Sequence, residues 1–318
     1  MRPQGALRGY SGRREEGIRG GLLQPLPRDH HRAGGRVDRP RGGERFEGAG
    51  GDGEVQGGAT VKVHLAIPYE LLRERLEEVL RHRLCPEIYF DAQALEGCND
   101  ADLRACAEAL REEGLTFSFH GPFMDLAPGA LDSKIKEVTW DRFSETMRLA
   151  SLVRPECVVF HVGYDPWRHG EYKELWIASS LEIWRPLFAK AEETGVRVAL
   201  ENVFDEGPHL IGEILTRAGN GWVGFCFDPA HHLLFSKVPL GDWLAALGER
   251  LVEVHVHDNH GQTDEHLPPG DGRVDFELLF SLLPHRDLLF TLEVHREEYV
   301  QRGLEGLMEM LQSWEATG

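Results

Sequence analysis

The stretch LVEVHVH at residues 251–257 alternates large apolar side chains with ionisable ones. Successive side chains of a β-strand point to opposite faces, so the three valines are predicted to share one face, with Glu253, His255 and His257 on the other. The same alternation recurs in three further segments, RVALE (197–201), VGFCFD (223–228) and LLFTLE (288–293). Each segment therefore predicts a strand with one large apolar face and an ionisable residue at the end of the other face.

Eight strand patterns alternate with helical patterns between Val61 and Trp314. Strands that alternate with helices form a parallel sheet, and eight such units predict an α/β fold, the closed (β/α)8 TIM barrel. An open doubly wound sheet is the alternative, but no GxGxxG or GxxxxGK[ST] motif follows a strand. The strands are predicted at 61–67, 87–91, 116–120, 157–161, 197–201, 223–228, 251–257 and 288–293, and helices at 69–81, 102–113, 134–152, 176–193 and 298–314.

Residues 1–60 differ in composition from the rest of the chain. They hold 16 of the 36 glycines and almost no periodic apolar pattern, so they cannot bury enough apolar surface to offset chain entropy. We predict a disordered Gly/Arg-rich extension at 1–60, followed by one barrel domain at 61–318. The extension carries 11 Arg and 8 Asp+Glu, which leaves 24 Lys+Arg against 45 Asp+Glu in the barrel. So acidic a body repels polyphosphate and disfavours nucleic acid as a partner.

Several protein classes are disfavoured by the remaining sequence features. No apolar run reaches the roughly 18 residues that a membrane-spanning helix needs, and no apolar secretion signal opens the chain. The five cysteines form no CxxC pair, which argues against a disulfide framework and indicates a reducing, cytoplasmic location. The oligomeric state stays open, a homo-oligomer included.

Ionisable residues end the inward face of seven of the eight predicted strands. Active sites of barrels assemble at this C-terminal mouth. Burying so many carboxylates unpaired is costly, and a cation offsets that cost. A mixture of carboxylate oxygens and imidazole nitrogens suits Mn²⁺, Mg²⁺, Co²⁺ or Zn²⁺. The seven residues are Asp91, His120, His161, Glu201, Asp228, His257 and Glu293.

Five motifs occur in order along the last four strands: LENVF (200–204), FDPAHH (227–232), HVHDN (255–259), DEHLPPGDG (264–272) and LEVH (292–295). From Val61 to Trp314 the chain resembles the xylose isomerase-like barrel superfamily, which includes sugar and sugar-phosphate isomerases and epimerases as well as endonuclease IV. The resemblance implies one metal held by Glu201, Asp228, His255 and Glu293, where the HxxD pattern selects His255 over His257. It also implies substrate contacts or additional metal ligands at His120, His161, His231, Asp264 and His266.

The resemblance implies a divalent-metal-dependent isomerase or epimerase that acts on a sugar, a sugar phosphate or a related polyol. A metal-bound enediolate would form, with Glu201 and Glu293 as the acid/base pair. Phe123 and Trp167 are predicted to form an apolar wall against the substrate carbons, although each could also be an ordinary packed loop aromatic.

Two other functions stay open. Endonuclease IV binds three zinc ions, and this sequence offers a candidate for each of its nine ligands, so a trinuclear zinc phosphodiesterase acting on abasic DNA is the alternative. The acidic body, the mouth loops 121–132 and 163–172 without clustered Lys or Arg, and the sugar-enzyme form of HLPPGDG favour small-molecule chemistry. A barrel that binds without turnover is the third reading, which the retained pair of glutamates disfavours.

Overall fold

Eight parallel strands close into a barrel in chain order, from β1 to β8, in the computed structural model, which describes residues 61–283 and 287–316. β8 pairs back onto β1, with Val63 opposite Phe290. The predicted (β/α)8 TIM barrel is thereby confirmed, while the extension predicted at 1–60 lies outside the described residues. The strands are β1 (Lys62–Pro68), β2 (Pro86–Tyr89), β3 (Ser118–His120), β4 (Cys157–His161), β5 (Arg197–Glu201), β6 (Val223–Phe227), β7 (Leu251–Val256) and β8 (Leu289–Leu292).

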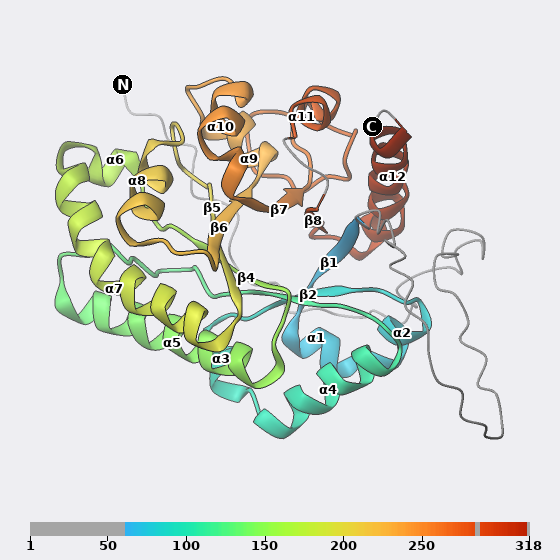
Figure 1. Cartoon of the computed structure of the whole chain (residues 1–318). Coiled ribbons are helices and arrows are strands. Elements are labelled where there is room, and N and C mark those ends of the chain that lie inside the picture. Colours follow the sequence, from blue (N-terminus) through green and yellow to red (C-terminus); the bar gives the residue numbers. More distant parts are fainter. Residues whose placement is uncertain (1–60, 284–286, 317–318) are drawn as a thin grey trace, which may run out of the picture.

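Helices surround the strands and follow them in order around the barrel (Figure 1). The α-helices are α1 (Tyr69–Glu74), α2 (Leu76–Arg81), α3 (Ala92–Gly97), α4 (Asp100–Glu112), α5 (Ser133–Val153), α6 (Pro166–His169), α7 (Lys173–Thr194), α8 (His209–Ala218), α9 (Pro229–Phe235), α10 (Leu240–Leu247), α11 (Phe276–Leu282) and α12 (Glu297–Ala316), with short 3-10 helices η1 (Gly170–Tyr172) and η2 (Gly248–Arg250). No helix in these residues is long and apolar enough to cross a membrane. All five cysteines are free.

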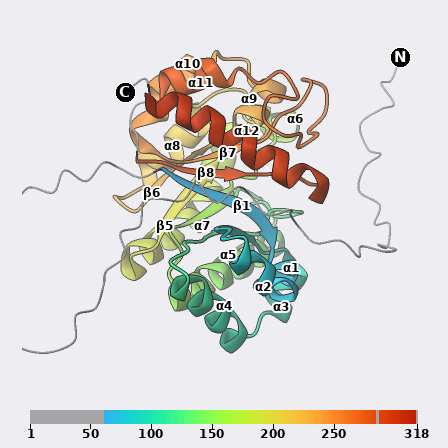
Figure 2. The same cartoon turned by 90° about the vertical axis from the view of Figure 1, so that its right-hand side faces the viewer.

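The last helix covers the seam where the barrel closes. Figure 2 shows α12 lying across β8 and β1. A Cβ atom at Gly303 would lie only 2.9 Å from Leu292 Cδ2, so glycine permits the close approach of α12 to β8. Leu307, Leu311 and Trp314 are buried on the same helix. The C-terminal helix therefore shields the joint between the first and last strands.

Side-chain parity separates two apolar layers, as the alternation predicts. The outer layer, between the strands and the helices, includes Phe227, Val256 and Phe290. The inner layer is a small cluster of buried residues: Cys157, Val159, Ala199, Cys226 and Leu289. Because the inner residues are small, the barrel interior has room for ionisable side chains.

Val252 departs from the predicted alternation. It was expected on the outer face, but it packs against the inner cluster. Along β6 and β7 the register shifts between Phe225 and Cys226, whose partners are Leu251 and Glu253. The shift leaves Val252 as an extra residue, and its side chain occupies the space in which a Cβ atom at Gly224 would stand. Such an irregularity inserts one residue and breaks the period of two, which no local pattern reveals.

Candidate metal centre

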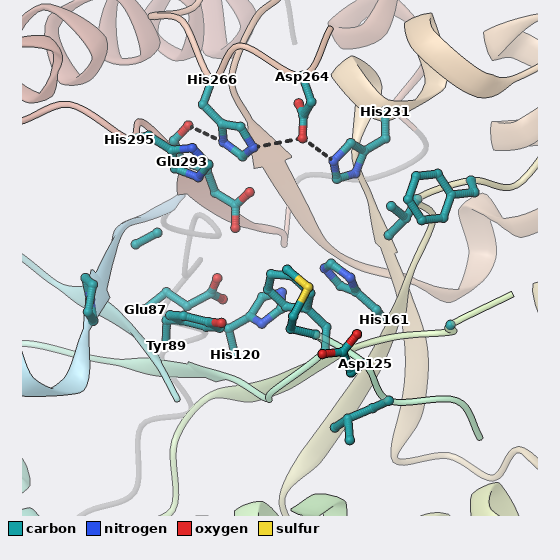
Figure 3. Close-up of a pocket in the computed structure, with 18 of the residues that line it drawn as sticks. Glu87, Tyr89, His120, Asp125, His161, His231, Asp264, His266, Glu293 and His295 are labelled. Carbon is teal, nitrogen blue, oxygen red and sulfur yellow. Dashed lines mark hydrogen bonds and ion pairs between the residues drawn. The ribbon is translucent and has the colours of Figure 1, made fainter. Parts of the chain in front are cut away.

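A cavity of about 1640 Å³ opens at the C-terminal mouth of the barrel. Seven of the predicted site residues line it: His120, Phe123, His161, His231, Asp264, His266 and Glu293. Figure 3 shows the Glu293 carboxylate pointing into the cavity, with His266, Asp264 and His231 on one side and Glu87, His120 and His161 on the other. Glu201, Asp228 and His255 are buried.

Glu201 lies at the centre of a ring of imidazoles. Its Oε2 is 3.2 Å from Nε2 of both His120 and His161 and 3.4 Å from His255 Nδ1. Its Oε1 is 3.1 Å from His231 Nδ1. The parallel register places His161 directly beside Glu201 at the ends of β4 and β5. One carboxylate thus faces histidines from four separate elements.

The four predicted ligands of a single metal come together. His255 Nδ1 is 3.4 Å from Glu201 Oε2 and 3.2 Å from Glu293 Oε1. One ligand atom each from Glu201, Asp228 and His255 lies within 4.8 Å of the others. Oxygen and nitrogen atoms this close can share one ion. The structure therefore brings together the residues that the family resemblance implies as ligands of one metal.

Asp228 is fixed from both sides. As the N-cap of α9 its Oδ1 accepts a hydrogen bond from the backbone N–H of His231 (2.7 Å), and its Oδ2 lies 2.8 Å from His257 Nε2. The Asn202 side chain brackets the Asp228 backbone with two hydrogen bonds of 2.8 and 2.9 Å. Asn202 is the N of the LENVF motif, so its place after Glu201 couples the ends of β5 and β6.

A second group of donors lies nearer the cavity opening. Asp264 Oδ2 is 3.3 Å from His231 Nε2 and 3.0 Å from His266 Nε2. The group consists of His231, His257, Asp264 and His266, whose ligand atoms lie within 4.8 Å of one another. It includes His257, although the HxxD pattern favours His255 over His257 as a metal ligand. His266 stacks between His257 and His295, with ring centroids 3.9 and 3.6 Å apart. His295 ends the LEVH motif, so the sequence contained a signal for it.

Two buried polar atoms of the predicted ligands have no hydrogen-bond partner within the described part of the chain: Glu201 Oε1 and His255 Nδ1. Buried polar atoms are almost always paired, so unpaired ones need an explanation. Lone pairs that converge on one place are what a cation requires. The residues present therefore fit a divalent ion held by Glu201, Asp228, His255 and Glu293.

Charge in the site is balanced by the imidazoles. Burial acts to raise the pKa of Glu201, but the charges of His161 and His255 hold that pKa well below its usual range. Burial acts to lower the pKa of His231, yet the neighbouring carboxylates of Asp228, Asp264 and Glu201 raise it well above its usual value. An imidazole must lose the proton from its coordinating nitrogen before that nitrogen can bind a metal ion.

Two buried carboxylates escaped the sequence prediction. Glu87 on β2 accepts a hydrogen bond from Ser118 Oγ (3.1 Å), and Glu253 on β7 accepts one from Thr291 Oγ1. Burial and the neighbouring Glu87 raise the pKa of Glu253 well above its usual value. Burial opposes ionisation of Glu87 as well, but His255 lowers the pKa of Glu87 to about 2. Glu253 shares its strand face with His255, so parity alone could have identified it.

Three further predictions concern the rim. Asp91 does not point into the mouth, because its carboxylate caps α3 by accepting the N–H of Ala94 (2.7 Å). Phe123 lines the cavity and stacks on His161, with ring centroids 4.2 Å apart. Trp167 is 90% exposed on α6 and does not line the cavity. An aromatic residue in a loop can face either the cavity or the solvent. The path of the loop determines which of the two it faces, and the sequence does not reveal that path.

Fold and site together define a TIM barrel with a cluster of carboxylates and imidazoles at its mouth that could hold a divalent metal. The chain belongs to the xylose isomerase-like TIM barrel family, whose model matches residues 86–313. It is similar to the TTHB071 protein of Thermus thermophilus, a structure soaked with ZnCl2, at 28% identity and a TM-score of 0.67 over 81% of this chain and 99% of that one.

Two further solved structures share the fold, and another relative is matched by sequence. A D-tagatose 3-epimerase-like protein superposes with a TM-score of 0.70 at 22% identity, over 80% of this chain and 99% of that one. The IolI protein with a bound zinc atom superposes with a TM-score of 0.66 at 20% identity, over the same shares of the two chains. The MJ1311 protein of Methanocaldococcus jannaschii is 27% identical over 164 residues, which cover 49% of this chain and 56% of that protein.

Proposed function

We propose that this chain is a divalent-metal-dependent isomerase or epimerase of a sugar or related polyol, with Glu201 and Glu293 as its acid/base pair. One observation carries the proposal: carboxylates from β5 and from the end of β8 approach the same imidazole nitrogen, His255 Nδ1, at 3.4 and 3.2 Å. The epimerase-like and zinc-containing structural neighbours support the same chemistry.

The reaction needs a proton moved at carbon. A divalent cation, when bound, supplies a Lewis acid for a carbonyl and its adjacent hydroxyl. One glutamate takes the proton from the carbon beside the carbonyl, and the other, carrying a proton, delivers one. Delivery to the opposite face of the same carbon epimerises the sugar, whereas delivery to the former carbonyl carbon, with the proton of the adjacent hydroxyl passing to the former carbonyl oxygen, interconverts aldose and ketose. Phe123 offers a sugar an apolar wall, and His231 and His266 offer hydrogen bonds to its hydroxyl groups.

The charge of the cavity favours an uncharged polyol. Arg75 and Arg168 are the lysine or arginine residues among its lining side chains. Arg75 is paired with Glu297 (2.9 Å) and Arg168 with Asp165 (3.4 Å), so each cation already has an acidic partner. Contacts to a nucleic-acid backbone require clustered basic side chains.

A second candidate function rests on the ligand groups that flank the first. His120, His161 and Glu201 form one, and His231, His257, Asp264 and His266 form the other. Three neighbouring ions are the arrangement expected of the trinuclear zinc phosphodiesterase acting on abasic DNA. The number of metal ions per chain separates the two proposals.

The decisive experiment combines metal quantification with a proton-exchange screen in D₂O over ketoses, aldoses and inososes. We expect Glu201→Gln and Glu293→Gln each to reduce exchange by at least about 100-fold, because each removes a proton-transferring group. Glu265→Gln is the matched control, since it makes the same charge change on a mouth loop and should leave exchange intact. Three zinc ions per chain with cleavage at abasic sites would support the second candidate instead, and normal exchange in both glutamine variants would refute the acid/base assignment.

A further inference from the structure

Two carboxylates lie beneath the metal centre, inside the barrel. Glu87 and Glu253 are fully buried, and Glu87 Oε1 and Glu253 Oε2 have no hydrogen-bond partner among the residues described. Neither forms an ion pair with a lysine or arginine in that part of the chain. Burying a carboxylate away from such partners is expensive, so its retention points to a task.

His255 stands between these carboxylates and the metal centre. Its Nδ1 faces Glu201 and Glu293, at 3.4 and 3.2 Å. Its Nε2 faces the other way, 3.4 Å from Glu87 Oε1 and 3.8 Å from Glu253 Oε1. A neutral imidazole carries one N–H, so Nδ1 can offer its lone pair to a cation only when Nε2 holds the hydrogen. That hydrogen needs an acceptor, and Glu87 Oε1 is the nearer one.

Glu87 is itself fixed from below. Its Oε2 accepts a hydrogen bond from Ser118 Oγ (3.1 Å), a residue opposite it in the β2–β3 register. Ser118 Oγ is 2.8 Å from His64 Nδ1, and His64 Nε2 is 2.9 Å from Thr116 Oγ1. A continuous series of polar contacts thus runs through the barrel floor and sets the direction of the Glu87 carboxylate.

We infer that Glu87 is a positioning residue of the metal centre: it accepts the Nε2–H of His255 and so presents Nδ1 to the cation. The inference rests on the proposed function, because it takes His255 as a ligand. Imidazole ligands are commonly oriented by an acceptor on their other nitrogen, and loss of that acceptor typically weakens metal binding 10- to 100-fold. The contact measures 3.4 Å, and the inference requires that it shorten to a full hydrogen bond when an ion binds.

Metal affinity of the full chain tests this inference. Competition for Co²⁺ against a chromophoric chelator measures the affinity without any substrate. We expect Glu87→Gln to bind Co²⁺ about 10-fold more weakly, since its amide oxygen still accepts a hydrogen bond but carries no charge, and Glu87→Met about 100-fold more weakly. The ¹⁵N shifts of His255 in the Zn²⁺-loaded chain should report hydrogen on Nε2 in the wild type and a changed tautomer balance in Glu87→Met.

Glu253→Gln is the matched control. It makes the same side-chain substitution at an equally buried site two residues from His255, at the carboxyl group more distant from Nε2, and should change Co²⁺ affinity less than about threefold. Equal weakening in both glutamine variants would mean that the contact with His255 Nε2 is not what matters and would overturn the positioning role. Unchanged affinity in Glu87→Gln with a lower melting temperature would also overturn it, in favour of a structural role.

The failures can be told apart. A wild-type chain that takes up no divalent cation contradicts the proposed function and this inference together, whereas equal binding by wild type and Glu87→Gln removes this inference alone. Should Glu87→Gln not fold, Ser118→Ala replaces it, because it removes only the hydroxyl that directs Glu87. Severalfold weaker Co²⁺ binding is expected there, and wild-type binding would count against the inference.

Discussion

Asp205 presents a carboxyl group on the wall of the mouth cavity, four residues beyond Glu201. Its side chain is only 4% exposed; Oδ2 accepts the N–H of Val203 (3.3 Å), and Oδ1 has no hydrogen-bond partner in the described residues. Burial raises the pKa of Asp205 to about 7. At neutral pH this group is therefore poised between its acid and its carboxylate.

That pKa predicts a pH dependence of stability. Between about pH 4 and 7 the unfolded chain releases the proton while the folded chain retains it, so the free energy of unfolding falls as pH rises through this window and is level above it. We expect the free energy of unfolding of Asp205→Asn to lack this fall. The difference in that free energy between the variant and the wild type should therefore grow in favour of the variant by up to about 4 kcal/mol from about pH 4 to about pH 8. Urea unfolding across this range measures it, with the neighbouring Glu206→Gln as control. Parallel profiles of wild type and Asp205→Asn would contradict it.

The site residues that lie on strands could be predicted from the alternation of side chains along each strand. Glu201, Asp228, His255 and Glu293 each follow from alternation plus the family motifs, and the structure brings them together. Glu87 was not predicted as a site residue because the strand-end pattern selects the last inward residue of each strand. In the strand predicted at 87–91 that residue is Asp91. Asp205 was missed because its burial depends on the path of its loop, which has no period to read.

At the scale of elements, one side chain organises the loop that brings Asp264 and His266 to the cavity. The buried carboxylate of Asp258 accepts hydrogen bonds from five backbone N–H groups, those of Asn259, Gly270, Gly272, Arg273 and Val274, at 2.8 to 3.0 Å. A Cβ atom at Gly272 would collide with Asp258 Oδ1, so the loop can close only on glycine. Asp258 thus acts as the anchor of the whole 259–274 segment.

Asp258→Asn should destabilise the chain by about 3 kcal/mol or more, because several charge-assisted hydrogen bonds to one buried carboxylate weaken together. Asp275→Asn is the control, since that side chain caps α11 through a single bond to Leu278 N, worth about 1 kcal/mol. Urea denaturation, with limited proteolysis of the loop, measures both. Equal losses in the two variants would show that Asp258 does no more than an ordinary cap.

Helix boundaries could be predicted from the sequence where the local spacing of apolar residues determines them. The helices expected at 134–152 and 176–193 are α5 and α7, each extended by a few residues. The helix expected at 69–81 is instead divided at Arg75, whose side chain reaches Glu297 at the start of α12. That contact joins residues 222 positions apart, so no local period contains it.

At the scale of the molecule, the metal centre is expected to contribute to stability. An ion that binds only the folded chain stabilises it by about 2.7 kcal/mol at a free concentration about 100 times its dissociation constant. Removal with a chelator should therefore lower the melting temperature by roughly 5–10 °C for a domain of this size, and adding back Mn²⁺ or Zn²⁺ should restore it. Thermal melts with and without EDTA test this, with Glu201→Gln as a variant that should not respond. Identical melts of the wild type would argue against a bound ion.

The closure of β8 onto β1 has a consequence for assembly. A sheet that ends in an open strand offers unpaired N–H and C=O groups along its margin, and foreign chains can add there. In the described residues every strand has two neighbours, so this surface has no such margin. Between copies of the described barrel, association therefore uses helix surfaces or loops, by side-chain packing and not by extending the sheet.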